Sequence, residues 1–270
     1  MTAASDQGSK SPTKSAVAAS KEAPEPRAQV VVLAGGLATR MRPRTADLPK
    51  FLLPVAGRPF GVWLLERLAR CGFEDVLLCI GHLGQLVRDA IGDGGTFGVR
   101  VRYCEDGPTL LGTAGALRKA LDLLEPSFLT TYGDSYLPFD YMAPLADLRA
   151  HPEALGTMAV HHNRDRWEPS NAAVEGELVV RYEKGRAAAL DHIDYGATAL
   201  RREVVARLPE GIAVGLESLQ ARLAVERRLR ALVARERFYE IGSQAGLADL
   251  EAHLRGREHE DSSSRPRLER

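Results

Sequence analysis

The order of apolar and polar positions in the first half of the chain predicts strands that alternate with helices. Short apolar or β-branched runs, typical of strands buried on both faces, occupy Val30 to Leu33, Asp75 to Ile80, Val99 to Cys104 and Phe128 to Tyr132. Apolar residues recur at helical spacing over Arg58 to Cys71, His82 to Ile91 and Leu111 to about Leu124. This order predicts a parallel sheet with helices on both faces, joined by right-handed crossovers.

The pattern changes at about His151. Strand-like segments separated by polar turns follow, at Gly156 to His162, Ala172 to Glu175, Leu178 to Glu183 and Ile193 to Leu200. We expect them to form an antiparallel extension that closes over the cleft of the parallel sheet. Two more helical patterns come after it, at Leu216 to Leu223 and Ser243 to Leu254.

Both ends of the chain lack the apolar residues that a packed segment needs. Residues 1–27 are rich in Ala, Ser, Lys and Pro and show no periodicity, so we expect them to be disordered. Residues 256–270 are equally polar, and we expect a disordered tail there. The predicted domain is therefore residues 28–255.

Composition narrows the class of protein. The chain has 36 basic and 36 acidic residues, and this balance disfavours a nucleic-acid binder, which usually has a basic surplus. No apolar run is long enough for a membrane span, and the first residues lack the apolar core of a secretory signal. The three cysteines form no C-x-x-C pair and favour reduced, buried thiols. We expect a cytoplasmic enzyme.

A glycine turn followed by cations forms the first candidate site. Ala34, Gly35 and Gly36 come directly after the first strand, and Thr39, Arg40 and Lys50 follow in one loop. Backbone N–H groups of such a turn cradle phosphate oxygens, and the cations offset their charge. The turn does not fit G-x-G-x-x-G, and an ordinary strand-to-helix turn with a solvated basic loop is the alternative.

Two later motifs lie where ligands of parallel sheets bind, at the carboxyl ends of the strands. Gly112, Thr113 and Ala114 open a helix, and small residues there leave exposed N–H groups and room for a flat ring. Gly133 and Asp134 follow a strand, so the carboxylate can enter the cleft and suit Mg²⁺. A tight loop-to-helix join and a turn residue are the respective alternatives.

The stretches VVVLAGGLATRMRPRTADLPKFLLP, LGTAGAL and YGDS together resemble the sugar-phosphate nucleotidyltransferases. One main departure is Ala38, where the family has a third glycine; another is Glu240, which replaces the aspartate of the family's F-x-D-I-G segment. The resemblance covers about residues 29–255. It implies an α/β fold: a mixed, mostly parallel, Rossmann-like (GT-A-like) three-layer sandwich with an antiparallel acceptor-binding extension.

The same resemblance implies roles for individual residues. Those expected to bind the nucleotide are Leu33, Ala34, Gly35, Gly36, Thr39, Glu105, Gly112, Thr113 and Ala114. Those expected to act in catalysis are Arg40, Lys50 and Asp134, with Asp134 and Glu240 as ligands of a Mg²⁺ cofactor. Those expected to bind the sugar phosphate are Asn171, Glu183, Lys184, Asp194, Tyr195 and Gly196.

The activity that the resemblance implies joins a nucleoside triphosphate to a sugar 1-phosphate and releases pyrophosphate. GTP with a mannose- or heptose-type sugar 1-phosphate is favoured. These two substrates are the expected partners, with no nucleic acid and no membrane, and a homodimer is compatible with the assignment. Two alternatives stay open: a catalytically idle relative that binds a sugar nucleotide and regulates a partner, and cytidylyl or uridylyl transfer to another phosphate acceptor.

Overall fold

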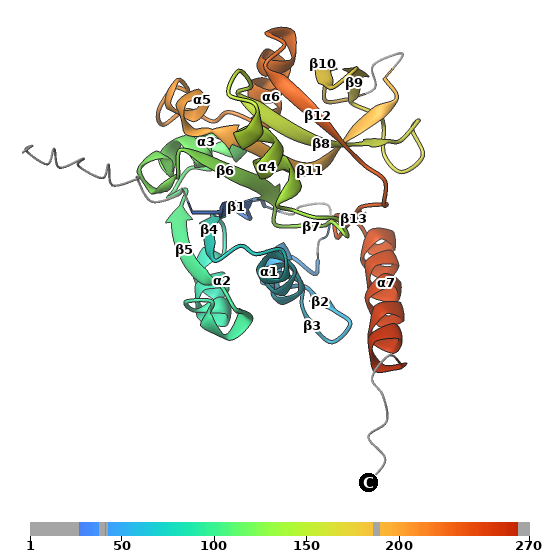
Figure 1. Ribbon diagram of the computed structural model, residues 1–270. Coiled ribbons are helices and arrows are strands. Elements are labelled where there is room, and N and C mark those ends of the chain that lie inside the picture. The colour runs from blue at the N-terminus through green and yellow to red at the C-terminus, as the bar shows by residue number, and fades with distance from the viewer. Residues whose placement is uncertain (1–26, 38–40, 42, 186–189, 264–270) are drawn as a thin grey trace, which may run out of the picture.

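A nine-stranded mixed sheet runs through the computed structural model, which describes residues 27–37, 41, 43–185 and 190–263 (Figure 1). Across the sheet the strands are β5 (Arg100–Glu105), β4 (Asp75–Ile80), β1 (Gln29–Leu33), β6 (Ser127–Tyr132), β11 (His192–Arg201), β8 (Gly156–His162), β12 (Leu229–Ala234), β10 (Leu178–Tyr182) and β9 (Ala172–Glu175). β1 pairs in parallel with β4 and β6, and β4 pairs in parallel with β5. β11 runs antiparallel between β6 and β8.

Helices cover both faces of the sheet, because successive residues of a strand point to opposite faces. On β1, Val30 and Val32 join one buried core, whereas Val31 and Leu33 join the other. The first core takes side chains from α1 (Phe60–Arg70), α2 (Gly84–Ile91), α4 (Ala143–Ala150) and α7 (Gln244–Ser263). The second takes them from α3 (Gly112–Lys119), α5 (Arg202–Ala206) and α6 (Leu216–Val225). The expected three-layer α/β sandwich is confirmed.

The remaining elements are short and lie at the ends of the layers. Two small two-stranded sheets pair β2 (Pro54–Val55) with β3 (Arg58–Pro59) and β7 (Ser135–Tyr136) with β13 (Tyr239–Glu240). Single 3₁₀ turns are η2 (Lys50–Leu52), η3 (Gly95–Phe97) and η4 (Leu121–Leu123). The β7–β13 pair matters most, since it brings a C-terminal segment beside the end of β6.

The second half of the chain extends the main sheet and does not form a layer of its own. The expected antiparallel strands are present as β8, β9, β10 and β11, and β8 also runs parallel to β12 on its other side. The sequence analysis did not predict β12. Its residues, LRALVA, mix helix formers with one β-branched residue, so this short run carries no periodic signal for either structure.

The predictions of disorder at the two ends of the chain have different outcomes. Residues 1–26 lie outside the described residues, so the expected disorder there stays a prediction. The expected loose tail from residue 256 is wrong as far as Ser263, where α7 ends. Polar helix formers such as Arg and Glu extend a helix without apolar burial, and Arg255 pairs with Glu251 one turn earlier at 2.6 Å. In the described ranges no helix is both long and apolar enough to cross a membrane.

A buried carboxylate ties three parallel strands together at the end opposite the ligand site. Asp75, at the start of β4, accepts hydrogen bonds from Gln29 Nε2 at 2.9 Å, Arg102 Nη2 at 2.6 Å and Arg100 Nη2 at 3.2 Å. Burial raises the pKa of Asp75, but the hydrogen bonds of Arg102 and Gln29 and the two guanidinium charges outweigh it. The net pKa lies below the ordinary value, so the folded state favours the ionised carboxylate.

Candidate active site

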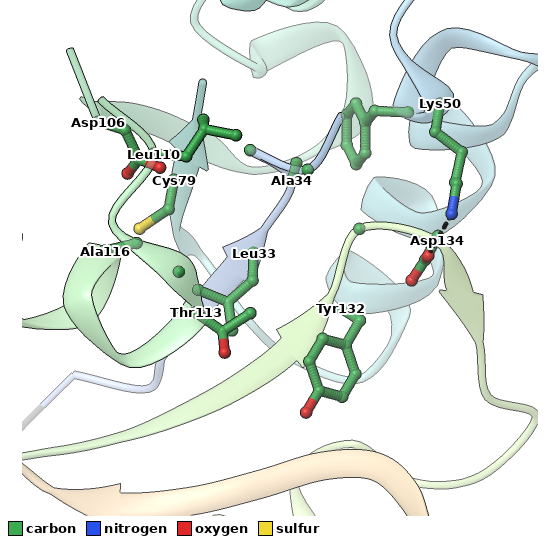
Figure 2. Close-up of a pocket in the computed structure, with 15 residues that line it drawn as sticks. Leu33, Ala34, Lys50, Cys79, Asp106, Leu110, Thr113, Ala116, Tyr132 and Asp134 are labelled. Atoms are coloured by element: carbon green, nitrogen blue, oxygen red, sulfur yellow. Dashed lines mark hydrogen bonds and ion pairs between the residues drawn. The ribbon is translucent and has the colours of Figure 1, made fainter. Parts of the chain in front are cut away.

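A pocket of about 230 Å³ opens at the carboxyl ends of β1, β4 and β6 (Figure 2). Its volume is several times the ~30 Å³ that a water molecule occupies in the liquid, so it admits an organic ligand. Eight residues singled out in the sequence line it: Leu33, Ala34, Gly35, Gly36, Lys50, Gly112, Thr113 and Asp134. The structure therefore brings the three sequence motifs to one cavity, at the place that α/β sheets use for ligands.

The glycine turn is packed tightly on one side and open on the other. Ala34 N donates to Cys79 O on β4 at 2.8 Å, and Gly133 N donates to Leu33 O at 2.9 Å. A Cβ added to Gly133 would lie 2.7 Å from the Ala34 Cβ, whereas one added to Gly36 would meet nothing within 4 Å. The turn is thus fixed between β4 and β6, while the backbone of Gly36 is open to a ligand.

Lys50 and Asp134 meet at one end of the pocket. Lys50 begins η2, whose next residues Phe51 and Leu52 are buried and fix the turn. Lys50 Nζ lies 2.8 Å from Asp134 Oδ2, and both side chains keep some exposure to solvent. Figure 2 shows the two side chains pointing toward one another across the mouth of the cavity. A cation and a hard carboxylate are therefore available to the same ligand.

The L-G-T-A-G motif is shaped by contact with the segment before α6. Ala114 N and Gly115 N both donate to Val214 O, at 2.9 and 3.1 Å. A Cβ at Gly112 would lie 2.7 Å from Val214 O, and Gly112 has φ +70°. Thr113 Oγ1 accepts from Leu216 N at 2.7 Å. Gly112 and Thr113 still line the pocket, but Ala114 is fully buried and the structure does not place it there.

Asp106 lies at the opposite end of the pocket, whereas the sequence analysis predicted its neighbour Glu105 to bind the nucleotide. Glu105 points away and pairs with Arg88 at 2.6 Å on the exposed surface. Asp106 lines the pocket, and its Oδ2 accepts from Leu111 N at 3.4 Å. Burial raises the pKa of Asp106 above its ordinary value, against the opposing effects of Leu111 N–H and the Lys119 charge. Alternation along β5 was the available signal, since 104 and 106 share a face that 105 does not.

Tyr195 is a core residue in this structure, not one at an open acceptor site. Its side chain is 1% exposed and packs edge-to-face on Phe139 and Phe238, with ring centroids 4.9 and 5.9 Å away. Its hydroxyl finds no hydrogen-bond partner among the described residues. The structure therefore places the Tyr195 side chain in the core, and its expected contact with sugar stays a prediction. Tyr195 belongs to the core on the α1 face, so β11 alternation turns it away from Asp194 and Gly196.

Asp194 on β11 forms a hydrogen bond with Asn171, which directly precedes β9. Asp194 N donates to Asn171 Oδ1 at 2.7 Å, and the Asp194 carboxylate accepts from Gly196 N, Gln220 Nε2 and Tyr182 OH at 2.9, 3.1 and 3.3 Å. Burial raises the pKa of Asp194 although these hydrogen bonds lower it. Gly196 has φ +98°, a conformation that favours glycine. These residues lie together, as predicted, but much of their hydrogen-bonding capacity serves the fold.

Glu183 and Lys184 follow β10 on an exposed loop. Glu183 Oε1 accepts from Arg181 Nε at 2.6 Å. The Lys184 side chain is 73% exposed, and its Nζ lies 3.7 Å from Glu217 Oε1. Glu217, in the first turn of α6, was missed by the sequence analysis because one acid at a helix start has an ordinary explanation in the helix dipole. Lys184 is thus available to a ligand.

Glu240 lies beside Asp134 through backbone pairing. Ile241 N donates to Asp134 O at 2.9 Å, and Glu240 is in register with Ser135 across the β13–β7 pair. Burial raises the pKa of the pocket residue Tyr132, and the nearby charges of Asp194, Glu217, Asp134 and Glu240 raise it further. The two carboxylates predicted to bind metal therefore act on one side chain of the pocket.

The donor set agrees with Mg²⁺ chemistry. Among the described residues there is no group of three or more His, Cys, Asp or Glu side chains arranged to hold a metal. Mg²⁺ usually takes one or two carboxylates and completes its shell with water and substrate phosphate. Asp134 and Glu240 fit that pattern. Thr39 and Arg40, predicted to contact phosphate, lie outside the described residues, as does Ala38.

Comparison with known proteins matches the chain to a family and to several relatives. Residues 30–210 match the family described as MobA-like NTP transferase domain. The chain is 39% identical over 127 residues to N-acetylmuramate alpha-1-phosphate uridylyltransferase of Neisseria meningitidis serogroup B, covering 46% of this chain and 54% of the relative. It is 31% identical over 190 residues to mannose-1-phosphate guanylyltransferase of Mycobacterium tuberculosis, covering 69% and 52%. The chain thus spans about half the length of these curated relatives.

A solved structure with the same architecture is HddC from Yersinia pseudotuberculosis complexed with GMP-PN. The TM-score is 0.71 at 23% identity, over 84% of this chain and 99% of that chain. Similarity at this level of identity establishes the fold alone, and it agrees with the sheet and helix layers described above.

Proposed function

We propose that this chain, which belongs to the MobA-like NTP transferase family, transfers a nucleotidyl group from a nucleoside triphosphate to a sugar 1-phosphate and releases pyrophosphate. The observation that carries the proposal is a pocket with two chemically different ends. One end holds Gly36 and the Lys50–Asp134 pair, and the other holds Asp106. A triphosphate suits the first end, and a flat polar ring suits the second.

The chemistry needs positioning and charge more than proton transfer. The attacking phosphate oxygen of the acceptor is already an anion, so it requires no general base. It attacks the α-phosphorus as the bond to the pyrophosphate oxygen breaks. The residues of the chain hold two polyanions in line and offset the charge that develops in the transition state.

Each charged side chain has a defined part in this proposal. Lys50 donates to an oxygen of the α-phosphate, and the open backbone at Gly36 approaches the leaving phosphates. Arg40 holds the β- and γ-phosphates, and Lys184, with its exposed ammonium, holds the acceptor phosphate. Asp134 and Glu240 hold Mg²⁺, which when bound supplies positive charge next to the reacting phosphate. Asp194 and Asn171 orient the loop that carries Lys184, the residue proposed to bind the acceptor phosphate.

Asp106 supports GTP as the nucleotide. A carboxylate accepts hydrogen bonds only, and guanine presents N1–H and N2–H donors side by side. Uracil and thymine present a single ring N–H between two carbonyl oxygens, which a carboxylate repels. A mannose- or heptose-type sugar 1-phosphate is the favoured acceptor, and the similarity to a mannose-1-phosphate guanylyltransferase supports it. The similarity to a uridylyltransferase makes UTP the rival.

Pyrophosphate release, measured with Mg²⁺ and each of GTP, UTP, dTTP, CTP and ATP against mannose 1-phosphate and other sugar 1-phosphates, tests the proposal. We expect GTP to give the highest kcat/KM. Asp106→Asn should lower kcat/KM for GTP by about 10–100-fold, because one of the two guanine donors then faces an amide. Glu105→Gln, one residue away on the surface, is the matched control and should change little.

Three outcomes separate the alternatives. A higher kcat/KM with UTP or CTP would overturn the guanine assignment and leave nucleotidyl transfer in place. Binding of a sugar nucleotide without pyrophosphate release from any pair of substrates would favour the idle regulatory relative. Release with phosphocholine in place of a sugar 1-phosphate would move the acceptor to another class.

A further inference from the structure

Two cysteines face each other across neighbouring strands next to the nucleotide pocket. Cys79 on β4 is the direct register partner of Cys104 on β5. Both side chains join the core on the α3 face of the sheet. Directly paired strands lie about 4.7–4.9 Å apart, which falls inside the 4.4–6.8 Å range of Cα separations in disulfides. The two thiols can therefore be joined with little movement of the backbone.

The two thiols differ in access. Cys79 is 1% exposed and lines the pocket, and Figure 2 shows its sulfur directed from β4 toward Ala116 of α3. Cys104 is half-buried, so part of its side chain reaches solvent. A small oxidant can thus reach Cys104 first, while Cys79 forms part of the wall against which a nucleotide would lie.

The pKa values of the two thiols also make Cys104 the more reactive one. The Cys79 thiol donates a hydrogen bond to Cys104, and this bond lowers the pKa of Cys104. The ammonium of Lys119, held by its hydrogen bond to Asp106 O at 2.8 Å, lowers that pKa further, against burial and the charges of Asp106 and Glu105. The same hydrogen bond and complete burial raise the pKa of Cys79. Cys104 is the better nucleophile, and Cys79 is placed as its partner thiol.

We propose that Cys79 and Cys104 are a dithiol that peroxide oxidises to a disulfide, and that this disulfide weakens the binding of nucleotide in the adjacent pocket. The Cys104 thiolate attacks one oxygen of hydrogen peroxide, forming a sulfenic acid and releasing hydroxide, which takes a proton to become water. The Cys79 sulfur then attacks the Cys104 sulfur, and the S–O bond breaks as a second water leaves. Two thiols and one peroxide give one disulfide and two waters.

The disulfide alters the pocket through Cys79. To bond with Cys104, the Cys79 sulfur must turn away from the pocket wall toward β5, which changes the surface against which a nucleotide would lie. A Cβ at Gly35 would lie 3.3 Å from Gly81 N, so this end of β4 also supports the glycine turn. Oxidation should therefore weaken nucleotide binding, and bound nucleotide should shift the dithiol–disulfide equilibrium toward the dithiol by the same factor. This coupling rests on the proposed function, whereas the disulfide itself does not.

Thiol mapping of the full-length protein tests the dithiol. The protein is treated with hydrogen peroxide, denatured and alkylated, and its peptides are analysed by mass spectrometry. We expect a linked Cys79–Cys104 peptide that dithiothreitol reverses, and an alkylated Cys71. The Cys71→Ser variant should give the same linkage, since Cys71 lies at the end of α1 in the other core. In Cys79→Ser, Cys104 should stop at a sulfenic acid that dimedone labels. In Cys104→Ser, Cys79 should stay alkylatable.

Absence of the linked peptide after peroxide, or linkage through Cys71, would overturn the dithiol. The coupling is tested by calorimetric titration of the reduced and oxidised Cys71→Ser protein with GTP and with UTP, each with Mg²⁺. We expect Kd to rise at least tenfold on oxidation and to recover with dithiothreitol. Equal affinities in the two states would overturn the coupling. A reduced protein that binds neither nucleotide would overturn the coupling together with the proposed function, and the peptide map would still decide the dithiol.

Discussion

The ammonium nitrogen of Lys50 lies 2.8 Å from a carboxylate oxygen of Asp134, although 84 positions separate the two residues in the chain. The contact joins the loop after β1 to the end of β6. It places the cation proposed for the α-phosphate and the acid proposed for the metal within reach of one ligand. Because neither side chain is fully buried, the pair is available for exchange with phosphate oxygens.

Replacement of either partner should reduce turnover far more than stability. Lys50→Ala and Asp134→Asn are each expected to lower kcat by about 10²–10³-fold, the usual cost of losing a preorganised charged contact in a transition state. The melting temperature should change little, since partly exposed ion pairs contribute about 0–1 kcal/mol. Arg255→Ala, which removes the cation of the pair on α7, is the control and should leave kcat unchanged. Near-normal kcat in Lys50→Ala would remove this loop from the triphosphate site.

Shortening the Glu240 side chain should lower kcat. Its strand is held on one side by the hydrogen bond from Ile241 N to Asp134 O, and a Cβ at Gly246 of α7 would clash with Glu240 O. The backbone therefore cannot advance to compensate for a lost methylene. Glu240→Asp should lower kcat about tenfold, and Glu240→Gln about 10²-fold, with a higher Mg²⁺ requirement in both. Pyrophosphate release is measured over a Mg²⁺ titration. An unchanged Mg²⁺ dependence in both variants would leave Asp134 as the one protein ligand in this proposal.

The two glycines at the pocket should respond differently to alanine. At Gly36 an added Cβ meets nothing within 4 Å, so Gly36→Ala should fold with an unchanged melting temperature and raise the KM for the nucleotide. At Gly133 the added Cβ would lie 2.7 Å from the Ala34 Cβ, so Gly133→Ala should lower the melting temperature by several degrees. Thermal unfolding and nucleotide KM are measured on both. A normal KM in Gly36→Ala would show that no ligand approaches this backbone.

The elements of the parallel half could be predicted because their signals are local. Mostly apolar strands such as Asp75–Ile80 differ from their surroundings, and Gly-Gly or Gly-Asp directly after a strand marks a turn at the ligand edge. The position of β12 could not be predicted, since its pairing with β8 and β10 depends on contacts distant in the chain. The length of α7 was missed because its last turns need no apolar face.

At the site, the sequence could not show which face a strand residue occupies. Glu105 was named and Asp106 was not considered, and Tyr195 was grouped with Asp194, although neighbours on a strand point in opposite directions. Strand alternation was readable, but the face that carries the pocket was not. Glu217 becomes visible only when α6 is placed beside the end of β10, which brings Lys184 within 3.7 Å of it.

Tyr195→Phe should change neither the stability of the protein nor the KM for the sugar phosphate to a large extent. The hydroxyl is buried and finds no partner in the described part of the chain, so its removal should change the free energy of unfolding by less than about 1 kcal/mol. The KM for the sugar phosphate should stay within about twofold, whereas Lys184→Ala should raise it about tenfold by removing one charged contact. Initial rates over a range of acceptor concentrations are measured for both variants. A raised acceptor KM in Tyr195→Phe would return Tyr195 to the binding site.

The Asp75 network should make stability depend on pH in acid. Because the folded-state pKa of Asp75 is below its ordinary value, the ionised form stabilises the fold at pH values above about 4. This stabilisation is lost as the pH falls from about 4 through the lowered pKa. Asp75→Asn should therefore cost about 2–3 kcal/mol in the free energy of unfolding at pH 7, and less below pH 4. Urea denaturation from pH 7 to pH 3 measures the difference, with Asp122→Asn as an exposed control. A pH-independent difference would contradict the assignment.

The place of β11 in the sheet has a consequence for how the chain is made. β6, which delivers Asp134, pairs on one side with β1, but its other edge is covered only by β11, at His192–Arg201. A ribosome that has released residues up to about 150 has therefore exposed β1, β4, β5 and β6, while β6 still presents an unpaired row of N–H and C=O groups. Such an edge is a template for association with other chains. Truncations that end before residue 192 should accumulate as aggregates, and the nucleotide half of this protein is a poor candidate for expression on its own.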